Sequence, residues 1–268
     1  MTSKEYTAAR RALLNALEAL EAQLDALVLV GAQAVYLLTG SAGSAIAPTT
    51  TDADLAIDAT LLSDDPRIGE ALVDAGFELL VIPGTWSWTD GVRVDLMVAA
   101  EQMSNTGGRR GARLGVHGNK AARKTAGLEP ALIDNDPVEI RSFEPEADPR
   151  VFTIRAAGPT ALLIAKLTKI RERAATADRL QPKDGLDVFR LLQTSEPEML
   201  ADMLRKLVDH VLTAGVTRAA VEFLRTDPEE VLIRLAIAAT AGVEDPEIVA
   251  ESMRALVEDL LESLGTLD

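Results

Sequence analysis

The chain has no cysteine among its 268 residues, which excludes disulfide bonds, thiolate metal sites and cysteine nucleophiles. It also lacks any apolar run near the roughly 18 residues that cross a membrane. The polar residues 1–5 lead into an amphipathic pattern instead of the apolar core of a signal peptide. We therefore expect a cytoplasmic protein with no membrane partner.

Positive charge is scarce as well, and the formal net charge is -15. Such a surface as a whole disfavours non-specific binding of nucleic acid. The exception is the segment from Ser104 to Lys124, which has no acidic residue, and whose glycines predict a mobile loop. We expect this basic segment to bind a phosphate-rich acceptor such as RNA, with a solvated loop as the alternative. Its lysines and arginines are Arg109, Arg110, Arg113, Lys120, Arg123 and Lys124.

The length favours about two domains. Up to residue 155 short apolar runs alternate with helical patterns, and from residue 156 nearly everything has helical periodicity. We expect strands at 27–30, 54–58, 77–82, 86–88, 92–96, 138–143 and 151–154, and helices at 3–25, 32–38 and 65–75. Later helices are expected at 159–174, 183–193, 196–213, 216–225, 228–241 and 246–264. The predicted fold class is α+β: a domain over 1–155 with a mixed β-sheet and an all-helical domain over 156–268.

Asp52 and Asp54 are the first candidate site residues. Side chains alternate between the two faces of a strand, so the two carboxylates point the same way. Two such charges repel each other unless a cation lies between them or one takes up a proton. Mg²⁺ binds carboxylate oxygens together with substrate phosphates and water. Because roughly seven acidic-x-acidic triples are expected by chance in so acidic a chain, the pair alone is weak evidence.

The surrounding sequence strengthens this prediction. Gly31 follows an apolar strand and opens a short helix, where backbone N–H groups can bind phosphates. Asp95 lies within the apolar strand Val92–Met97, and a carboxylate buried there needs a partner or a metal ion. Strand–glycine–helix, Asp-x-Asp and a third acid on a strand together predict one metal and nucleotide site.

This order of motifs resembles the DNA-polymerase-β-like nucleotidyltransferase superfamily. The matching blocks are residues 29–32, 50–55 and 94–96. Within the superfamily the chain looks most like the AbiEii-type branch, which includes the MenT toxins of type IV toxin–antitoxin systems. That likeness also rests on residues 165–171 and 182–188, so it covers about residues 28–192. Ala32 stands where the family has glycine or serine.

The resemblance implies a nucleotidyltransferase fold for the first domain and an NTP substrate. It implies that Asp52, Asp54 and Asp95 bind one or two Mg²⁺ ions, or that Asp95 activates the acceptor hydroxyl. It further implies that the second domain contributes to catalysis. Lys166 would contact the phosphates, and Asp184 or Asp187 would be the acidic residue of this domain. The nucleotide-binding candidates are Gly31, Ala32, Thr51, Lys166 and Lys183. A tRNA 3′ end as acceptor and a cognate antitoxin as partner follow from the same resemblance.

Other readings stay open at this point. A small-molecule acceptor, as in antibiotic-modifying relatives, is favoured by the acidic stretch 194–268, which has 16 acidic and 6 basic side chains. A catalytically silent nucleotidyltransferase fold would serve as a binding module. A sugar-nucleotide glycosyltransferase could also use Asp-x-Asp, but the Gly31 helix and the later Lys166 block count against it.

Overall fold

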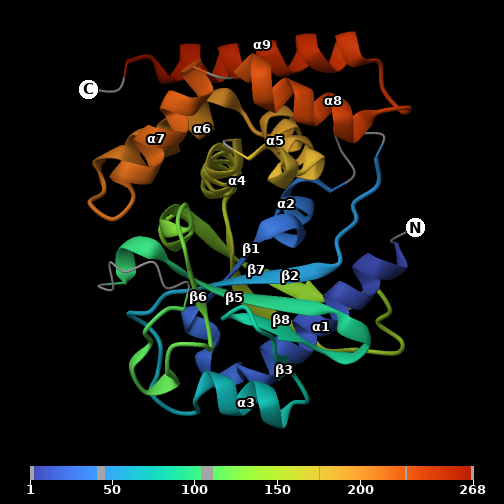
Figure 1. Ribbon diagram of the computed structural model, residues 1–268, viewed down its shortest axis with the longest axis vertical. Coiled ribbons are helices and arrows are strands. Elements are labelled where there is room, and N and C mark those ends of the chain that lie inside the picture. Colours follow the sequence, from blue (N-terminus) through green and yellow to red (C-terminus); the bar gives the residue numbers. More distant parts are fainter. Residues whose placement is uncertain (1–2, 41–45, 104–110, 175, 227, 267–268) are drawn as a thin grey trace. The chain divides into compact units, whose positions relative to one another are not determined.

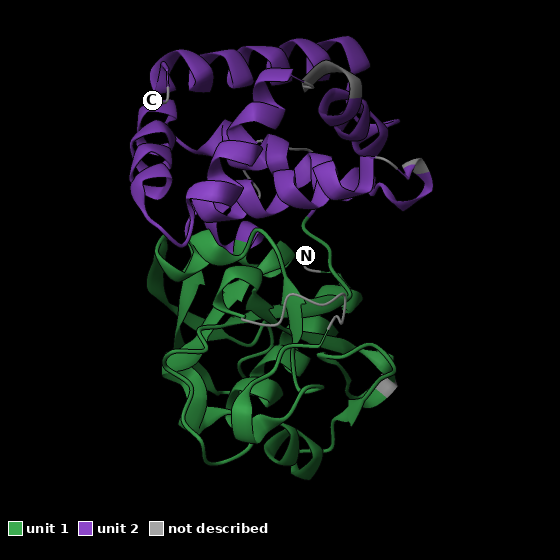
Figure 2. Cartoon of the chain, turned by 60° about the vertical axis from the view of Figure 1, so that its left-hand side comes forward, with its two compact units in different colours: residues 1–34, 48–157 green, residues 35–47, 158–268 purple. Residues whose placement is uncertain are grey.

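The protein, seen in a computed structural model, is described over residues 3–40, 46–103, 111–174, 176–226 and 228–266. Its fold is α+β with a mixed, open β-sheet (Figure 1). The chain divides into two compact units (Figure 2). The first unit comprises Met1–Ala34 and Pro48–Ala157, and the second comprises Val35–Ala47 and Gly158–Asp268. Residues 35–47, placed by sequence in the first domain, therefore group with the second unit.

The first unit contains the sheet. Among the described residues, seven strands follow the order β3-β4-β5-β2-β1-β8-β7, and an eighth, β6, pairs with β5. Strand β2 runs parallel to β5 and antiparallel to β1, which makes the sheet mixed. The strands are β1 (Leu27–Val30), β2 (Asp52–Ile57), β3 (Glu78–Leu79), β4 (Thr85–Ser87), β5 (Arg93–Ala99), β6 (Arg123–Thr125), β7 (Asn135–Arg141) and β8 (Val151–Ala157).

One face of this sheet is the core of the first unit. Ala53, Leu55 and Ile57 alternate along β2 and are fully buried, as is Leu96 of β5. Helix α1 (Lys4–Ala19) packs against β2 and β5 with its leucine stripe, of which Leu17 is fully buried. The opposite face of the same two strands carries Asp52, Asp54, Arg93 and Asp95, so the polar candidates share the other face.

The helices of the first unit lie near their predicted positions. Ser3 caps α1 by accepting a hydrogen bond from the Tyr6 N–H. The helix predicted over 3–25 is an α-helix followed by a 3₁₀-helix, Glu21–Ala26. The α-helices are α1 (Lys4–Ala19), α2 (Gly31–Thr39), whose last part belongs to the second unit, and α3 (Ile68–Asp74). Further 3₁₀ turns are Thr89–Gly91, Ala100–Gln102, Gly115–His117 and Glu129–Leu132.

The strand predicted over 77–82 is wrong beyond its first residues, because β3 contains only Glu78–Leu79. Val81 is fully exposed, so this apolar run does not pack in the core. The chain instead turns at Gly84, which has a φ of +75° and lies so close to β5 and β6 that a Cβ there would be 2.3 Å from the Leu96 carbonyl oxygen. The hairpin around Asp90–Gly91 is confirmed, with β4 antiparallel to β5.

The second unit is helical where the structure describes it. Helix α5 packs on α4 and α8, and α9 packs on α6 and α8. Their apolar faces form a second core, which includes Leu163, Phe189 and Met253. The helices are α4 (Pro159–Ala174), α5 (Pro182–Thr194), α6 (Pro197–Asp209), α7 (Ala214–Thr226), a π-helix (Pro228–Ile233), α8 (Arg234–Thr240) and α9 (Pro246–Leu264). Among the described helices, none combines the length and the apolarity that crossing a membrane requires.

Candidate functional site

The sheet register brings the three predicted aspartates to one face. In the parallel pair β2–β5, Asp54 lies opposite Asp95 and Asp52 lies opposite Arg93. Residues directly opposite each other point to the same face of a sheet. Asp52, Asp54 and Asp95 therefore share the face away from the core, as the sequence predicted. Asp95 is partly buried, and so is Asp52.

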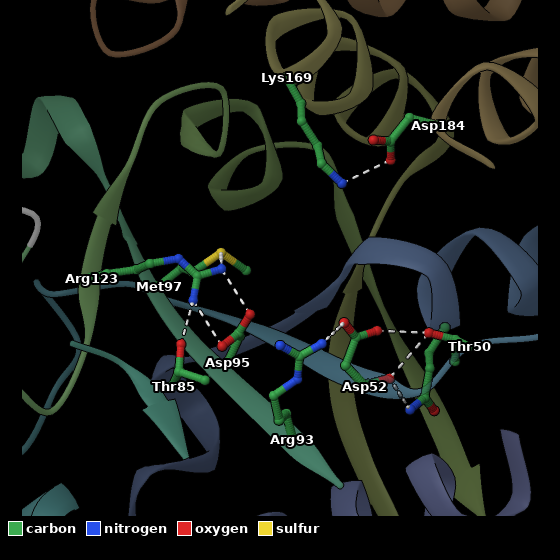
Figure 3. Close-up of polar contacts among 10 residues, drawn as sticks. Thr50, Asp52, Thr85, Arg93, Asp95, Met97, Arg123, Lys169 and Asp184 are labelled. Carbon is green, nitrogen blue, oxygen red and sulfur yellow. Dashed lines mark hydrogen bonds and ion pairs between the residues drawn. The ribbon is translucent and has the colours of Figure 1, made fainter. Parts of the chain in front are cut away.

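Asp52 is held by neighbours that the sequence analysis did not identify. The buried Thr50 hydroxyl donates to the Asp52 Oδ1 atom over 2.7 Å, and Arg93 Nη2 lies 4.0 Å from Oδ2 (Figure 3). Gln33 of α2 donates from Nε2 to the Asp52 carbonyl oxygen and accepts from Arg10 Nε. These contacts fix both the backbone and the carboxylate of Asp52, so its orientation is set before any ligand binds.

Gly31 makes room for Asp54. Its φ is +69°, and a Cβ built on it would lie 2.1 Å from the Asp54 Oδ2 atom. Any side chain at position 31 would therefore displace the carboxylate. The sequence assigned Gly31 to a phosphate cradle, and the structure adds that the space over its Cα is filled by Asp54. A carboxylate here also lies at the start of α2, where the helix dipole favours negative charge.

Asp95 forms an ion pair with Arg123 of β6. Arg123 Nη2 donates to the Asp95 Oδ2 atom over 2.9 Å, and Nη1 lies 2.8 Å from Oδ1 (Figure 3). The same guanidinium contacts the Thr85 hydroxyl and the Met97 sulfur. From its sequence context, Arg123 was expected among the acceptor-binding residues of a mobile loop. The structure places it in the sheet beside a candidate metal ligand.

The rest of the basic segment divides into several environments. Arg109 and Arg110 lie outside the described residues. Arg113 and Lys120 are exposed, whereas Lys124 is partly buried in β6. Residues 111–122 form a loop with one 3₁₀ turn, and a bridge from Gly111 to Arg123 connects this loop to β6. The buried His117 anchors this stretch, because its Nδ1 atom accepts from the Ile68 N–H.

In the second unit, the predicted residues of α4 and α5 form a buried charge cluster. Lys166 Nζ donates to Asp187 Oδ2 over 2.6 Å and to Asp184 Oδ1 over 3.1 Å. Lys169, which is more exposed, donates to the same Asp184 oxygen over 2.8 Å (Figure 3). Asp184 and Asp187 are three residues apart and so lie on one face of α5. The three residues that the resemblance assigned to the second domain thus lie together, as ion-pair partners of one another.

The electrostatics of this cluster favour its charged state. Burial alone would lower the pKa of Lys166, but the carboxylates of Asp187 and Asp184 outweigh burial and raise it. Burial would raise the pKa of Asp184, yet Lys166 and Lys169 hold it below its ordinary value. Burial and the charge of Lys166 lower the pKa of Lys169. Lys169 is thus the more accessible cation of the cluster.

The other predicted nucleotide-binding residues differ in exposure. Ala32 is buried, Thr51 is exposed and Lys183 is partly buried in the first turn of α5. The second unit adds the buried Arg190, which lies over the Tyr36 ring and donates to the Ile46 carbonyl oxygen. The sequence gives one indication that Arg190 has a special role: it is an arginine on the apolar face of a predicted helix.

The donor chemistry at Asp52 and Asp54 fits a hard divalent cation. Both supply carboxylate oxygens on one face, and Thr50 orients Asp52 as outer-shell partners commonly do. Over the described part of the chain, however, no three acidic or histidine side chains come close enough together to hold a metal ion. Asp52 and Asp54 are the candidate pair of carboxylate ligands, whereas Asp95 forms an ion pair with Arg123.

The sequence matches no protein-family model, and no curated protein shows a significant match to it.

Proposed function

We propose that this protein is a Mg²⁺-dependent nucleotidyltransferase with a nucleotidyltransferase-type fold in its first unit. One observation carries the proposal: the register of β2 with β5 gathers Asp52, Asp54 and Asp95 on the face of these two strands opposite the one that carries Leu55 and Leu96. Each of the three acids is partly exposed, and none fills the apolar core. Arg93 and Arg123 lie beside Asp52 and Asp95, and carboxylates this close together favour the binding of a further cation.

The reaction would transfer a nucleoside monophosphate from NTP to an acceptor. The acceptor hydroxyl oxygen bonds to the α-phosphorus, the bond from that phosphorus to the β-phosphate oxygen breaks, and pyrophosphate leaves with the electron pair. The hydroxyl proton passes to a base, for which Asp95 is the candidate. A Mg²⁺ ion at Asp52 and Asp54 would neutralise charge on the phosphates. Such transfer needs alignment and charge compensation more than covalent catalysis.

The charged candidates of the second unit differ in accessibility. Lys169 keeps part of its side chain accessible, and Lys183 lies at the start of α5. Lys166 is neutralised by its two aspartates and buried, so we assign it the task of holding Asp184 and Asp187 in place. This revises the direct phosphate contact that the family resemblance implied for Lys166.

The acceptor is proposed to be an RNA, with the tRNA 3′ end as the specific candidate. The exposed Arg113 and Lys120 support it, since they belong to a stretch without acids. A cognate antitoxin is part of the same proposal and rests on the family resemblance alone. A small hydroxylated acceptor is the enzymatic alternative.

A catalytically silent binding module is favoured by one observation, the ion pair that Asp95 already forms with Arg123.

Incubation with labelled NTPs, Mg²⁺ and either total tRNA or small hydroxylated compounds distinguishes these functions. We expect label on tRNA, and loss of labelling of at least about a hundredfold in Asp52→Asn and Asp54→Asn. Label on small compounds alone would move the acceptor to that class. No transfer at all by the wild type, or transfer unchanged in both variants, would contradict the enzyme proposal.

A further inference from the structure

Arg123 takes up both carboxylate oxygens of Asp95. Its Nη2 atom donates to Oδ2 over 2.9 Å, and its Nη1 atom lies 2.8 Å from Oδ1. The guanidinium is also held by the Thr85 hydroxyl at 3.4 Å and the Met97 sulfur at 3.2 Å. A metal ion bound to either oxygen at about 2.1 Å would lie close to the Arg123 guanidinium, and the two positive charges would repel each other.

The backbone of Arg123 is fixed as firmly as its side chain. Strand β6 pairs with β5 in parallel, with Arg123 opposite Met97. On its other side Gly84 comes so close that a Cβ there would lie 2.5 Å from the Arg123 backbone nitrogen. A bridge from Gly111 also reaches Arg123. The arginine is therefore part of the sheet and does not reach Asp95 from a free loop.

Counted over the three aspartates and the two arginines beside them, the net formal charge is smaller with one divalent ion than with two. Three carboxylates, Asp52, Asp54 and Asp95, stand against the two guanidinium groups of Arg93 and Arg123. They leave one unit of negative charge, which a single divalent cation turns into one unit of positive charge. A second divalent cation at Asp95 would face Arg123 at close range, where like charges repel strongly in a partly buried site.

We propose that Arg123 is the permanent cationic partner of Asp95, so that the site takes one divalent ion, at Asp52 and Asp54. This inference rests on the proposed metal-dependent function and deepens it, because the family resemblance allows two ions. Arg123 acts as a positioning residue: it holds Asp95 and presents positive charge on the face where the phosphates would bind.

Counting bound Mn²⁺ tests this directly, because the paramagnetic resonance signal of free Mn²⁺ gives stoichiometry and affinity without any turnover. The wild type should bind one ion, and Asp52→Asn combined with Asp54→Asn should abolish that binding. Arg123→Gln should add a second site or tighten binding at least about tenfold, since an opposite charge this close shifts carboxylate equilibria by that much. Arg141→Gln removes an exposed arginine–carboxylate pair elsewhere in the sheet and should change nothing.

Two further variants keep the test decisive if Arg123→Gln fails to fold. Asp95→Asn should leave the count at one, and Arg123→Lys should also keep one ion because the charge stays. Two ions on the wild type, with one lost in Asp95→Asn, would overturn the inference while leaving the nucleotidyltransferase proposal intact. An Arg123→Gln variant that binds like Arg141→Gln would also overturn it. No ion on any variant would overturn both the inference and the metal-dependent function.

Discussion

Replacing Gly31 by alanine probes the contact that places Asp54. The added Cβ would lie 2.1 Å from Asp54 Oδ2 and 2.7 Å from its Cγ. Alanine at a φ of +69° costs about 1–2 kcal/mol in backbone strain. Forcing a methyl group into filled space costs about 1–3 kcal/mol more. We therefore expect Gly31→Ala to lower the free energy of unfolding of the first unit by about 2–5 kcal/mol.

Gly76 provides the matched control. Its φ is +87°, yet a Cβ there would meet no atom within 4 Å. Gly76→Ala should thus show only the backbone strain, about 1–2 kcal/mol. Urea unfolding followed by tryptophan fluorescence suits the comparison, because the chain's two tryptophans, Trp86 and Trp88, both belong to the first unit.

A double variant connects the effect to Asp54. Asp54→Ala removes the two closest atoms and leaves the Asp54 Cβ, which would lie 2.8 Å from the new methyl group. In the double variant with Gly31→Ala, the loss of unfolding free energy should be smaller than the sum of the two single losses. We expect a coupling energy of about 1 kcal/mol or more. Equal losses for Gly31→Ala and Gly76→Ala, or strict additivity with Asp54→Ala, would refute the close contact between Gly31 and the carboxylate.

Three further predictions concern the charged groups. Lys166→Met removes the cation that pairs with the buried Asp187 and one of the cations that pair with Asp184. The free energy of unfolding of the second unit should therefore fall by about 3–5 kcal/mol, measured by circular dichroism; a loss under about 1 kcal/mol would contradict this. Because the folded pKa of Asp184 is lowered, its stabilisation is present above its ordinary pKa of 3.8 and is lost as the pH falls through the folded value. The midpoint temperature of thermal unfolding, measured between pH 7 and 2, should fall with pH in the wild type and fall less in Lys166→Met. Equal decreases would argue against the Lys166–Asp184 ion pair. Thr50→Val removes the hydrogen bond to Asp52 and should weaken Mn²⁺ binding about tenfold or more, with Thr49→Val as the unaffected control.

Local patterns were sufficient to predict most of the elements. The apolar run Leu27–Val30 is β1 with the predicted bounds, and Asp90–Gly91 forms the predicted turn between β4 and β5. The hairpin register then fixes which residues of β5 face the core, and Asp95 lies on the opposite face from Leu96. Two-residue alternation is thus enough to predict that Asp52 and Asp54 share a face, and the sheet order adds Asp95.

The partners of these residues could not be predicted in the same way. Strand β6 has only three residues, Arg123–Thr125, all polar, so no apolar alternation marks it as a strand. Its pairing with β5 is a tertiary contact, and so is the Arg123–Asp95 ion pair. In the second unit, the spacing of Asp184 and Asp187 predicts a shared helix face, but only the packing of α4 on α5 shows that Lys166 is buried between them.

The central claim is that this protein moves a nucleoside monophosphate, and the fate of two labels tests it most directly. The wild type is incubated with Mg²⁺, tRNA and NTP labelled either at the α- or at the γ-phosphate. The account predicts that the α-label joins the acceptor, that the γ-label leaves in pyrophosphate, and that both events disappear in Asp52→Asn. Transfer of the γ-label to the acceptor, or α-label transfer that persists in Asp52→Asn, would contradict it.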